Sequence, residues 1–317
     1  AAATSTSKSE KSKMSRQPAM VPEVLRVAQQ LKVIMMFIKN RDIFSEGALF
    51  ECGDTLIDGV KNNRKQLLYA LAFMRGQPEW VRHAVQLSGV LADMLIARDP
   101  HSRLIREAVI GALIHNMGKP LLIGKQIPSL KVNMNPGQRA FLKRHPDALL
   151  KKLTALNWEP GKTCRDIIEN ANERLDGSGY PAGKVASQLS DQARLVSVIK
   201  VVNKLTHERN GAAPMPPLDA YRWIHARPDV YETETVIEYI KHYGFYPIGS
   251  LAKFSGGFLA WIMDIDGKGM PNKVQLTKNL AFQDTSIDTV LTSADFHQIG
   301  TLEGIVNPDD FNVKPLI

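Results

Sequence analysis

Hydrophobic residues recur at helical spacing over most of the first 245 positions of the chain. Val24, Val27 and Leu31 lie three or four residues apart, and this spacing predicts an amphipathic helix. Similar patterns predict helices at residues 65–74, 81–97, 103–117, 138–153, 163–173 and 190–208, the last capped by Ser190. The sequence Gly76-Gln77-Pro78 interrupts the pattern and separates a first helical segment from the rest.

The period changes after Gly244, and short apolar runs replace the helical pattern. Residues 250–254 and 258–263 predict two strands joined by a Gly-Gly turn, and residues 273–277 predict a further strand. We therefore expect a mostly α-helical protein with four parts: a disordered tail at 1–20, a helical N-terminal segment at 21–77, a helical domain at 78–245 and a small β-rich extension at 246–317.

Composition narrows the classes of protein. The net charge of +8 suits an anionic ligand or partner, but the basic residues are scattered and no nucleic-acid-binding motif is present, so we expect no nucleic acid partner. No apolar run reaches the ~20 residues that cross a bilayer, and residues 1–20 lack the apolar core of a signal peptide. We expect a cytoplasmic protein with no transmembrane segment, whose Cys52 and Cys164 are reduced thiols.

A lysine stands in the middle of a helix that is otherwise apolar nearly all round. Leu195–Val202 has the pattern of a buried helix, and Lys200 lies within it. Lysine is almost never fully buried without a partner. Either the side chain extends along the helix to reach solvent, or this helix lines a polar cavity.

A glycine-rich loop follows the helix predicted at 163–173. Glycines that tolerate positive φ and a proline that fixes φ shape this loop: Gly177, Gly179, Gly183 and Pro181. We predict a tight, pre-shaped loop that displays Asp176 and Tyr180.

The string Glu173–Pro181 resembles the signature of the HD-GYP family, the metal-dependent phosphodiesterases that open cyclic di-GMP. Other landmarks follow in the family's order over residues 65–245. His115-Asn116 followed by Met117-Gly118-Lys119 resembles the HD motif, and further matching positions are Glu79, His83, His145, Ala171, Asn172, Lys200 and Arg209. The resemblance implies an HD-domain helical bundle.

The family's chemistry uses two or three Fe or Mn ions held by imidazoles and carboxylates. The resemblance places four substitutions at ligand positions: Asn116 for the HD aspartate, Ala171 and Asn172 for two adjacent histidines, and Lys200 for an aspartate. A lysine charge ~4 Å from a dication costs on the order of 8 kcal/mol at an effective dielectric near 20. We therefore expect no metal cofactor, with the Lys200 ammonium standing where a cation would stand and bonded to Asn116 and Asn172.

These features favour a non-catalytic binding or scaffold protein in cyclic di-GMP signalling or a related bacterial cell-surface process. One alternative is a residual Fe- or Mn-dependent phosphodiesterase that uses the remaining remnant positions, Glu79, His83, His115 and His145. Another is a sensor that binds a cyclic dinucleotide without cutting it, with Lys119, Lys200 and Arg209 facing the phosphates.

The loop is also a candidate protein-binding surface, because it is intact while the metal-ligand positions beside it are replaced. The resemblance implies a diguanylate cyclase domain as the partner, bound through Asp176, Gly177, Gly179, Tyr180 and Pro181. The alternative is that the Tyr180 ring packs back on its own helices.

Overall fold

A computed structural model describes residues 20–124, 134–208 and 212–314 of the chain. The predicted tail, apart from its last residue, and Arg209 lie outside these ranges. In chain order the elements are α1 (Val21–Asn40), α2 (Glu46–Leu71), a 3₁₀ turn η1 (Ala72–Gly76), α3 (Glu79–Arg98), α4 (Leu104–Ile114), α5 (Gly118–Leu122), α6 (Pro136–Leu142), α7 (His145–Ala155), α8 (Lys162–Asn170), η2 (Ala186–Gln188), α9 (Asp191–Thr206), α10 (Pro217–His225), α11 (Thr233–Tyr243), β1 (Leu251–Phe254), β2 (Phe258–Ile265), β3 (Pro271–Asn279), β4 (Phe282–Thr292), η3 (Ser293–Gln298), β5 (Leu302–Val306) and η4 (Pro308–Phe311).

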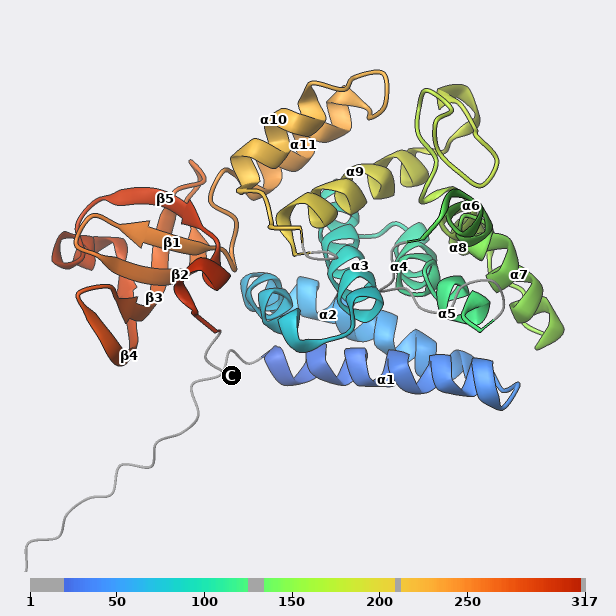
Figure 1. The fold of residues 1–317 in the computed structure, drawn as a ribbon, viewed down its shortest axis with the longest axis horizontal. Helices are drawn as coiled ribbons and strands as arrows, with labels where there is room; N and C mark the ends of the chain where they lie inside the picture. The colour runs from blue at the N-terminus through green and yellow to red at the C-terminus, as the bar shows by residue number, and fades with distance from the viewer. Residues whose placement is uncertain (1–19, 125–133, 209–211, 315–317) are drawn as a thin grey trace, which may run out of the picture.

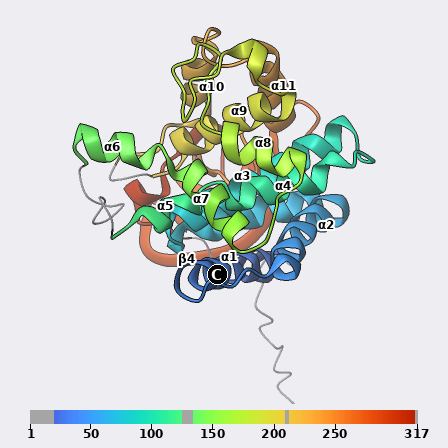
Figure 2. The ribbon, with the colours of Figure 1, turned by 90° about the vertical axis from the view of Figure 1, so that its right-hand side faces the viewer.

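The helices form one body and the strands a smaller one beside it (Figure 1). Helix α3 is central, because it packs against α2, α4 and α9. Its apolar residues Leu87 and Leu91 are fully buried, as the helical spacing predicts. Helices α1 and α2 lie along one side of this core, and α10 and α11 lie on the opposite side (Figure 2). The expected mostly α-helical bundle with a β-rich extension is confirmed.

In the described part of the chain the sheet is antiparallel, with five strands in the order β4-β3-β2-β1-β5. The predicted Gly-Gly turn joins β1 to β2, with Gly257 at φ +79°. Alternate residues of β2 face opposite sides: Leu259 and Trp261 pack with the helices, whereas Ala260 and Ile262 belong to a separate core of the sheet. The sheet is thus joined to the helical body by one apolar face.

Two of the predicted helices are interrupted at residues that matter for the site. The helix expected at 103–117 ends at Ile114, and Gly118 begins α5, where a Cβ would lie 1.8 Å from the carbonyl oxygen of His145. The helix expected at 138–153 is two helices, because Pro146 has no N–H to continue the hydrogen bonding of α6. This break places His145 at the start of α7.

Other boundaries differ less. The helix expected at 163–173 ends at Asn170, and the stretch 65–74 is the last part of the longer α2 and η1. Helices α10 and α11 and strands β4 and β5 were not predicted. The Ser190 cap is confirmed, since its hydroxyl accepts a hydrogen bond from the backbone N–H of Ala193 at 3.0 Å. Within the described residues, no helix has the length and apolar character that crossing a membrane requires.

Candidate functional site

Six of the predicted site residues are buried side chains of the helical body. They are His83 on α3, His115 and Asn116 in the turn after α4, His145 at the start of α7, Asn172 after α8 and Lys200 on α9. The rings of His83 and His115 are 5.7 Å apart, centroid to centroid. Asn172 accepts a hydrogen bond from Lys200 and lies next to His145, and the charge of Lys200 acts on all three histidines. We call these residues, together with Asn116, which follows His115 in the chain, the buried cluster.

Lys200 is fully buried and hydrogen-bonded. Its Nζ donates to Oδ1 of Asn172 at 2.7 Å, and Nδ2 of Asn172 lies 3.5 Å from Nε2 of His145. With 0% of its surface exposed, the lysine does not reach solvent, so the interpretation in which its side chain extends to the surface is excluded. The predicted bond from Lys200 to Asn116 is absent from the described contacts, and Oδ1 of Asn116 is buried without a partner among them.

The three histidines are poor bases in this environment. Burial lowers the pKa of each well below its ordinary value, because it penalises the imidazolium form. For His83 and His115 the next cause is the charge of Lys200, and for His145 it is the charge of Lys119. At neutral pH the cluster therefore consists of neutral imidazoles and amides around one buried lysine.

The family chemistry raises the question of whether this cluster fits a divalent metal. Nε2 of His83 and Nε2 of His115 are buried without hydrogen-bond partners among the described residues. Imidazole nitrogens that are available to bind a metal ion would look the same. However, no group of three or more His, Cys, Asp or Glu side chains in the described ranges is arranged to hold a metal ion. The buried Lys200 beside them opposes a cation. The donor set does not fit a di- or trinuclear metal centre.

The other predicted site residues lie outside the cluster. Glu79 is exposed at the first turn of α3, one turn before His83, and does not line the cluster. Lys119 is half-buried on α5, close enough for its charge to act on His145. Arg209 lies outside the described residues.

Two residues that the sequence reasoning missed support the cluster. Oδ1 of Asn203 lies 2.7 Å from Nδ1 of His83 and fixes the orientation of that ring. Its position three residues after Lys200, on the same face of α9, was the signal available in the sequence. Glu173 is fully buried, and its carboxylate accepts hydrogen bonds from the N–H groups of Ala182 at 2.8 Å and Lys184 at 3.0 Å.

These bonds shape the glycine-rich loop. Gly177 and Gly183 have positive φ values of 77° and 67°, as predicted. Gly179 was predicted to allow a positive φ, but its φ is not positive. Glycine is needed there for space, because a Cβ would lie 2.4 Å from Cα of Glu173. Asp176 is exposed, and its Oδ1 accepts hydrogen bonds from the N–H and hydroxyl of Ser178.

Tyr180 connects the loop to the cluster. Its backbone N–H donates to the carbonyl of Asn172 at 3.1 Å, and its ring lies 5.9 Å from the ring of His145. The Nζ of Lys143 lies 5.8 Å from the centre of the tyrosine ring. The ring is half-buried, so part of it packs on its own helices and part remains exposed next to the exposed Pro181.

The helical body thus brings histidines and a lysine from several helices together in one buried polar cluster. The family model of the HD domain matches residues 66–233, more than half of the chain, and the chain belongs to this family.

Two characterised proteins are similar to the same region. The chain is 26% identical over 180 residues to the cyclic di-GMP phosphodiesterase PA4108 of Pseudomonas aeruginosa, covering 57% of this chain and 42% of that protein. It is 24% identical over 181 residues to the cyclic di-GMP phosphodiesterase response regulator RpfG of Xanthomonas campestris pv. campestris, covering 57% and 47%. The match thus spans less than half of each relative, and it makes the chain an HD-GYP-like member of the HD superfamily.

Proposed function

We propose that this chain is a non-hydrolysing HD-GYP-like protein that acts by binding, as a scaffold or adaptor, in cyclic di-GMP signalling. The observation that supports it is the hydrogen bond between the fully buried Lys200 and Asn172. The resemblance places both residues at metal-ligand positions, and here they satisfy each other. A cluster closed in this way has an internal cation and no need of a bound one.

The chemistry of the remaining groups supports the same proposal. Hydrolysis of a phosphodiester at neutral pH needs a strong nucleophile, which a metal ion supplies by lowering the pKa of bound water. The three histidines have depressed pKa values, so they are neutral, and in the described ranges they do not belong to a group of side chains that could hold such an ion. We therefore propose that the protein carries no stoichiometric Fe, Mn or Zn and does not cut cyclic di-GMP.

The test measures metal content and turnover in matched proteins. The wild-type chain is analysed for bound metal and incubated with cyclic di-GMP and added Mn²⁺ or Fe²⁺. The comparison protein carries Asn116→Asp, Ala171→His, Asn172→His and Lys200→Asp, which together restore the family's ligand types. We expect metal binding only in the comparison protein. Two tightly held metals in the wild type, or turnover that is lost in His115→Ala, would refute the proposal.

The binding partner that we propose is a diguanylate cyclase domain, contacted through the loop. The support is geometric: buried Glu173 holds the loop in one shape while Asp176 and Pro181 stay exposed and Tyr180 stays half-exposed. A rigid loop loses little conformational entropy on binding, and tyrosine is a frequent interface hot spot.

Titration with diguanylate cyclase domains of the host tests this part. Tyr180→Ala should weaken binding at least tenfold, corresponding to ~1.4 kcal/mol or more. Phe245→Ala removes an exposed aromatic ring elsewhere and should leave the affinity unchanged. Equal affinities for both folded variants would exclude the loop as the binding surface.

A second candidate function is a cyclic dinucleotide sensor. The observation that favours it is positive charge near the half-exposed Tyr180 ring, from Lys143 beside the ring and Lys119 on α5. Lys200 contributes less to such a site than the sequence predicts, because its ammonium is buried on Asn172. Calorimetric titration with cyclic di-GMP separates the two functions: saturable binding that Lys119→Ala weakens supports the sensor, and no binding supports the scaffold.

A further inference from the structure

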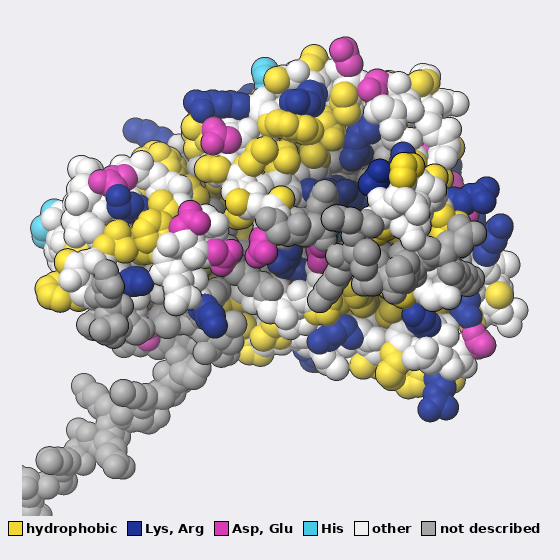
Figure 3. Space-filling view, viewed as in Figure 1, with side chains coloured by type: hydrophobic (Ala, Val, Ile, Leu, Met, Phe, Trp, Pro, Cys, Tyr) yellow, Lys and Arg dark blue, Asp and Glu magenta, His cyan; other side chains and the backbone are white. Residues whose placement is uncertain are grey.

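A cavity of about 550 Å³ lies between the helical body and the sheet, away from Lys200 and the glycine-rich loop. Its helical side comes from α2, α3, α9, α10 and α11, and its other side from β1, β2, β5 and the segment that follows β5. The volume falls within the range of small-molecule sites. Figure 3 shows hydrophobic side chains gathered over α9 and α10 on the same face of the molecule.

The walls of the cavity are mostly apolar and aromatic. Tyr221, Tyr239 and Tyr243 line the helical side, and Trp261 lines the sheet side. Rings on two sides of a space suit a flat apolar molecule, because each ring removes a large area of the ligand from water. The aromatic residues therefore indicate the shape and the apolar character of the ligand.

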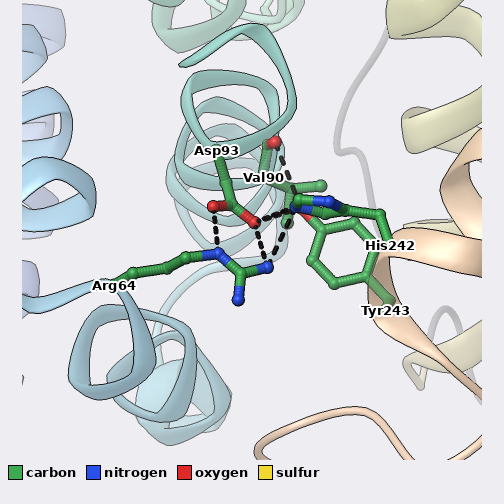
Figure 4. Close-up of polar contacts among 5 residues, drawn as sticks. All are labelled: Arg64, Val90, Asp93, His242 and Tyr243. Atoms are coloured by element: carbon green, nitrogen blue, oxygen red, sulfur yellow. Dashed lines mark hydrogen bonds and ion pairs between the residues drawn. The ribbon is translucent and has the colours of Figure 1, made fainter. Parts of the chain in front are cut away.

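The charged groups in the wall already have partners. The guanidinium of Arg64 makes a bidentate pair with Asp93, donating at 2.5 and 2.9 Å (Figure 4). Asp93 itself is not among the residues that line the cavity. The same carboxylate lies 2.8 Å from Nε2 of His242 and accepts a hydrogen bond from the Tyr243 hydroxyl at 2.9 Å. The acidic lining residue Asp310 is exposed to solvent. An ionic ligand would thus find no buried counter-charge.

We propose that this cavity binds an uncharged, mostly apolar small molecule. The site would be independent of the metal-ligand positions and of the docking loop. It touches the buried cluster at one point, since Asn203 lines the cavity and also holds the ring of His83. Gln86, which accepts a hydrogen bond from Asn203 at 3.1 Å, lines the cavity as well.

The test uses the neutral naphthalene ketone prodan, whose emission reports the polarity around its carbonyl. We expect saturable binding to the full chain with a blue shift. Val306→Trp fills the cavity from β5 and should weaken binding at least tenfold, whereas Val290→Trp makes the same change on the exposed surface of β4 and should have no effect. Met215→Trp, at a partly exposed lining position, repeats the blocking test where folding is not at risk.

A further measurement addresses the chemical class. The anionic dye 1-anilinonaphthalene-8-sulfonate should displace prodan at least tenfold more weakly than unlabelled neutral ketones of similar size. Absence of saturable binding, binding unchanged in both blocking variants, or preferred binding of the anion would each overturn the proposal.

Discussion

Replacing Lys200 by aspartate is the sharpest test of the buried cluster. The side chain is fully buried, and its ammonium donates to Asn172. Lys200→Asp removes the cation and places a carboxylate among neutral imidazoles and amides. Breaking a buried charge arrangement in this way costs about 3–5 kcal/mol. At about 2–4 °C per kcal/mol for a domain of this size, even the lower value predicts a fall in melting temperature of roughly 6–12 °C.

The destabilisation caused by Lys200→Asp should change with pH in a definite direction. A carboxyl buried without a counter-charge has a folded-state pKa raised above its unfolded value of about 3.9. The folded state then holds its proton more tightly than the unfolded state, so the destabilisation is small in acid and grows as pH rises between the two pKa values. The fall in melting temperature of Lys200→Asp should therefore be larger at pH 8 than at pH 5.

The assay is thermal unfolding followed by circular dichroism, with Lys151→Asp as the control. Lys151 is exposed in the middle of α7, so the control makes the same change of charge in a helix without burial. We expect the control to move the melting temperature by only a degree or two. Equal shifts for the two variants, or a Lys200→Asp penalty independent of pH, would refute the account of Lys200 as a buried internal cation.

Three further predictions concern stability. Asp93→Asn should lower the free energy of unfolding by about 3–5 kcal/mol at pH 7, as measured in urea. Burial alone would raise the Asp93 pKa, but its hydrogen bonds from His242 and Arg64 outweigh burial and hold the pKa below its usual value, so the difference from wild type should shrink as the pH falls through that lowered pKa. Gly179→Ala should cost about 1–3 kcal/mol and increase proteolysis of the loop, because its Cβ would meet backbone atoms at 2.4 Å; an unaltered digestion pattern would contradict this. Ser190→Ala should cost about 1 kcal/mol by removing the cap of α9, and a melting curve identical to wild type would show that the cap is not needed.

The sequence predicts the fold well where one physical signal dominates. Apolar periodicity identifies α3 and α9, and the Gly-Gly turn identifies β1 and β2. The prediction from apolar periodicity fails at His115 and Pro146. A turn at His115 and the proline at 146 each divide a stretch that the periodicity predicts as one continuous helix. The prediction also missed α10 and α11, short helices whose contacts are with α9 and with each other rather than within a long apolar stripe.

Six of the seven predicted remnant positions are buried, and the predicted hydrogen bond from Lys200 to Asn172 is present, whereas Oδ1 of Asn116 has no partner among the described residues. The burial of Lys200 follows from its apolar neighbours along α9, whereas the choice of Asn172 over Asn116 as its partner depends on how two separate turns approach α9. The exposure of Glu79 likewise depends on where α3 begins relative to η1. Such details are set by tertiary packing, which spacing along the chain does not contain.

A positively charged side chain differs from a bound metal ion because it does not depend on the concentration of that ion in the cell. The occupancy of a metal site follows the free concentration of the ion, and for iron it also follows the oxidation state. Under the proposed function, the Lys200 side chain is present in every folded copy, since it cannot leave the protein, be chelated or change with the oxidation state of iron. Order in such a site would then not depend on the supply of iron or on oxidative stress in the cell.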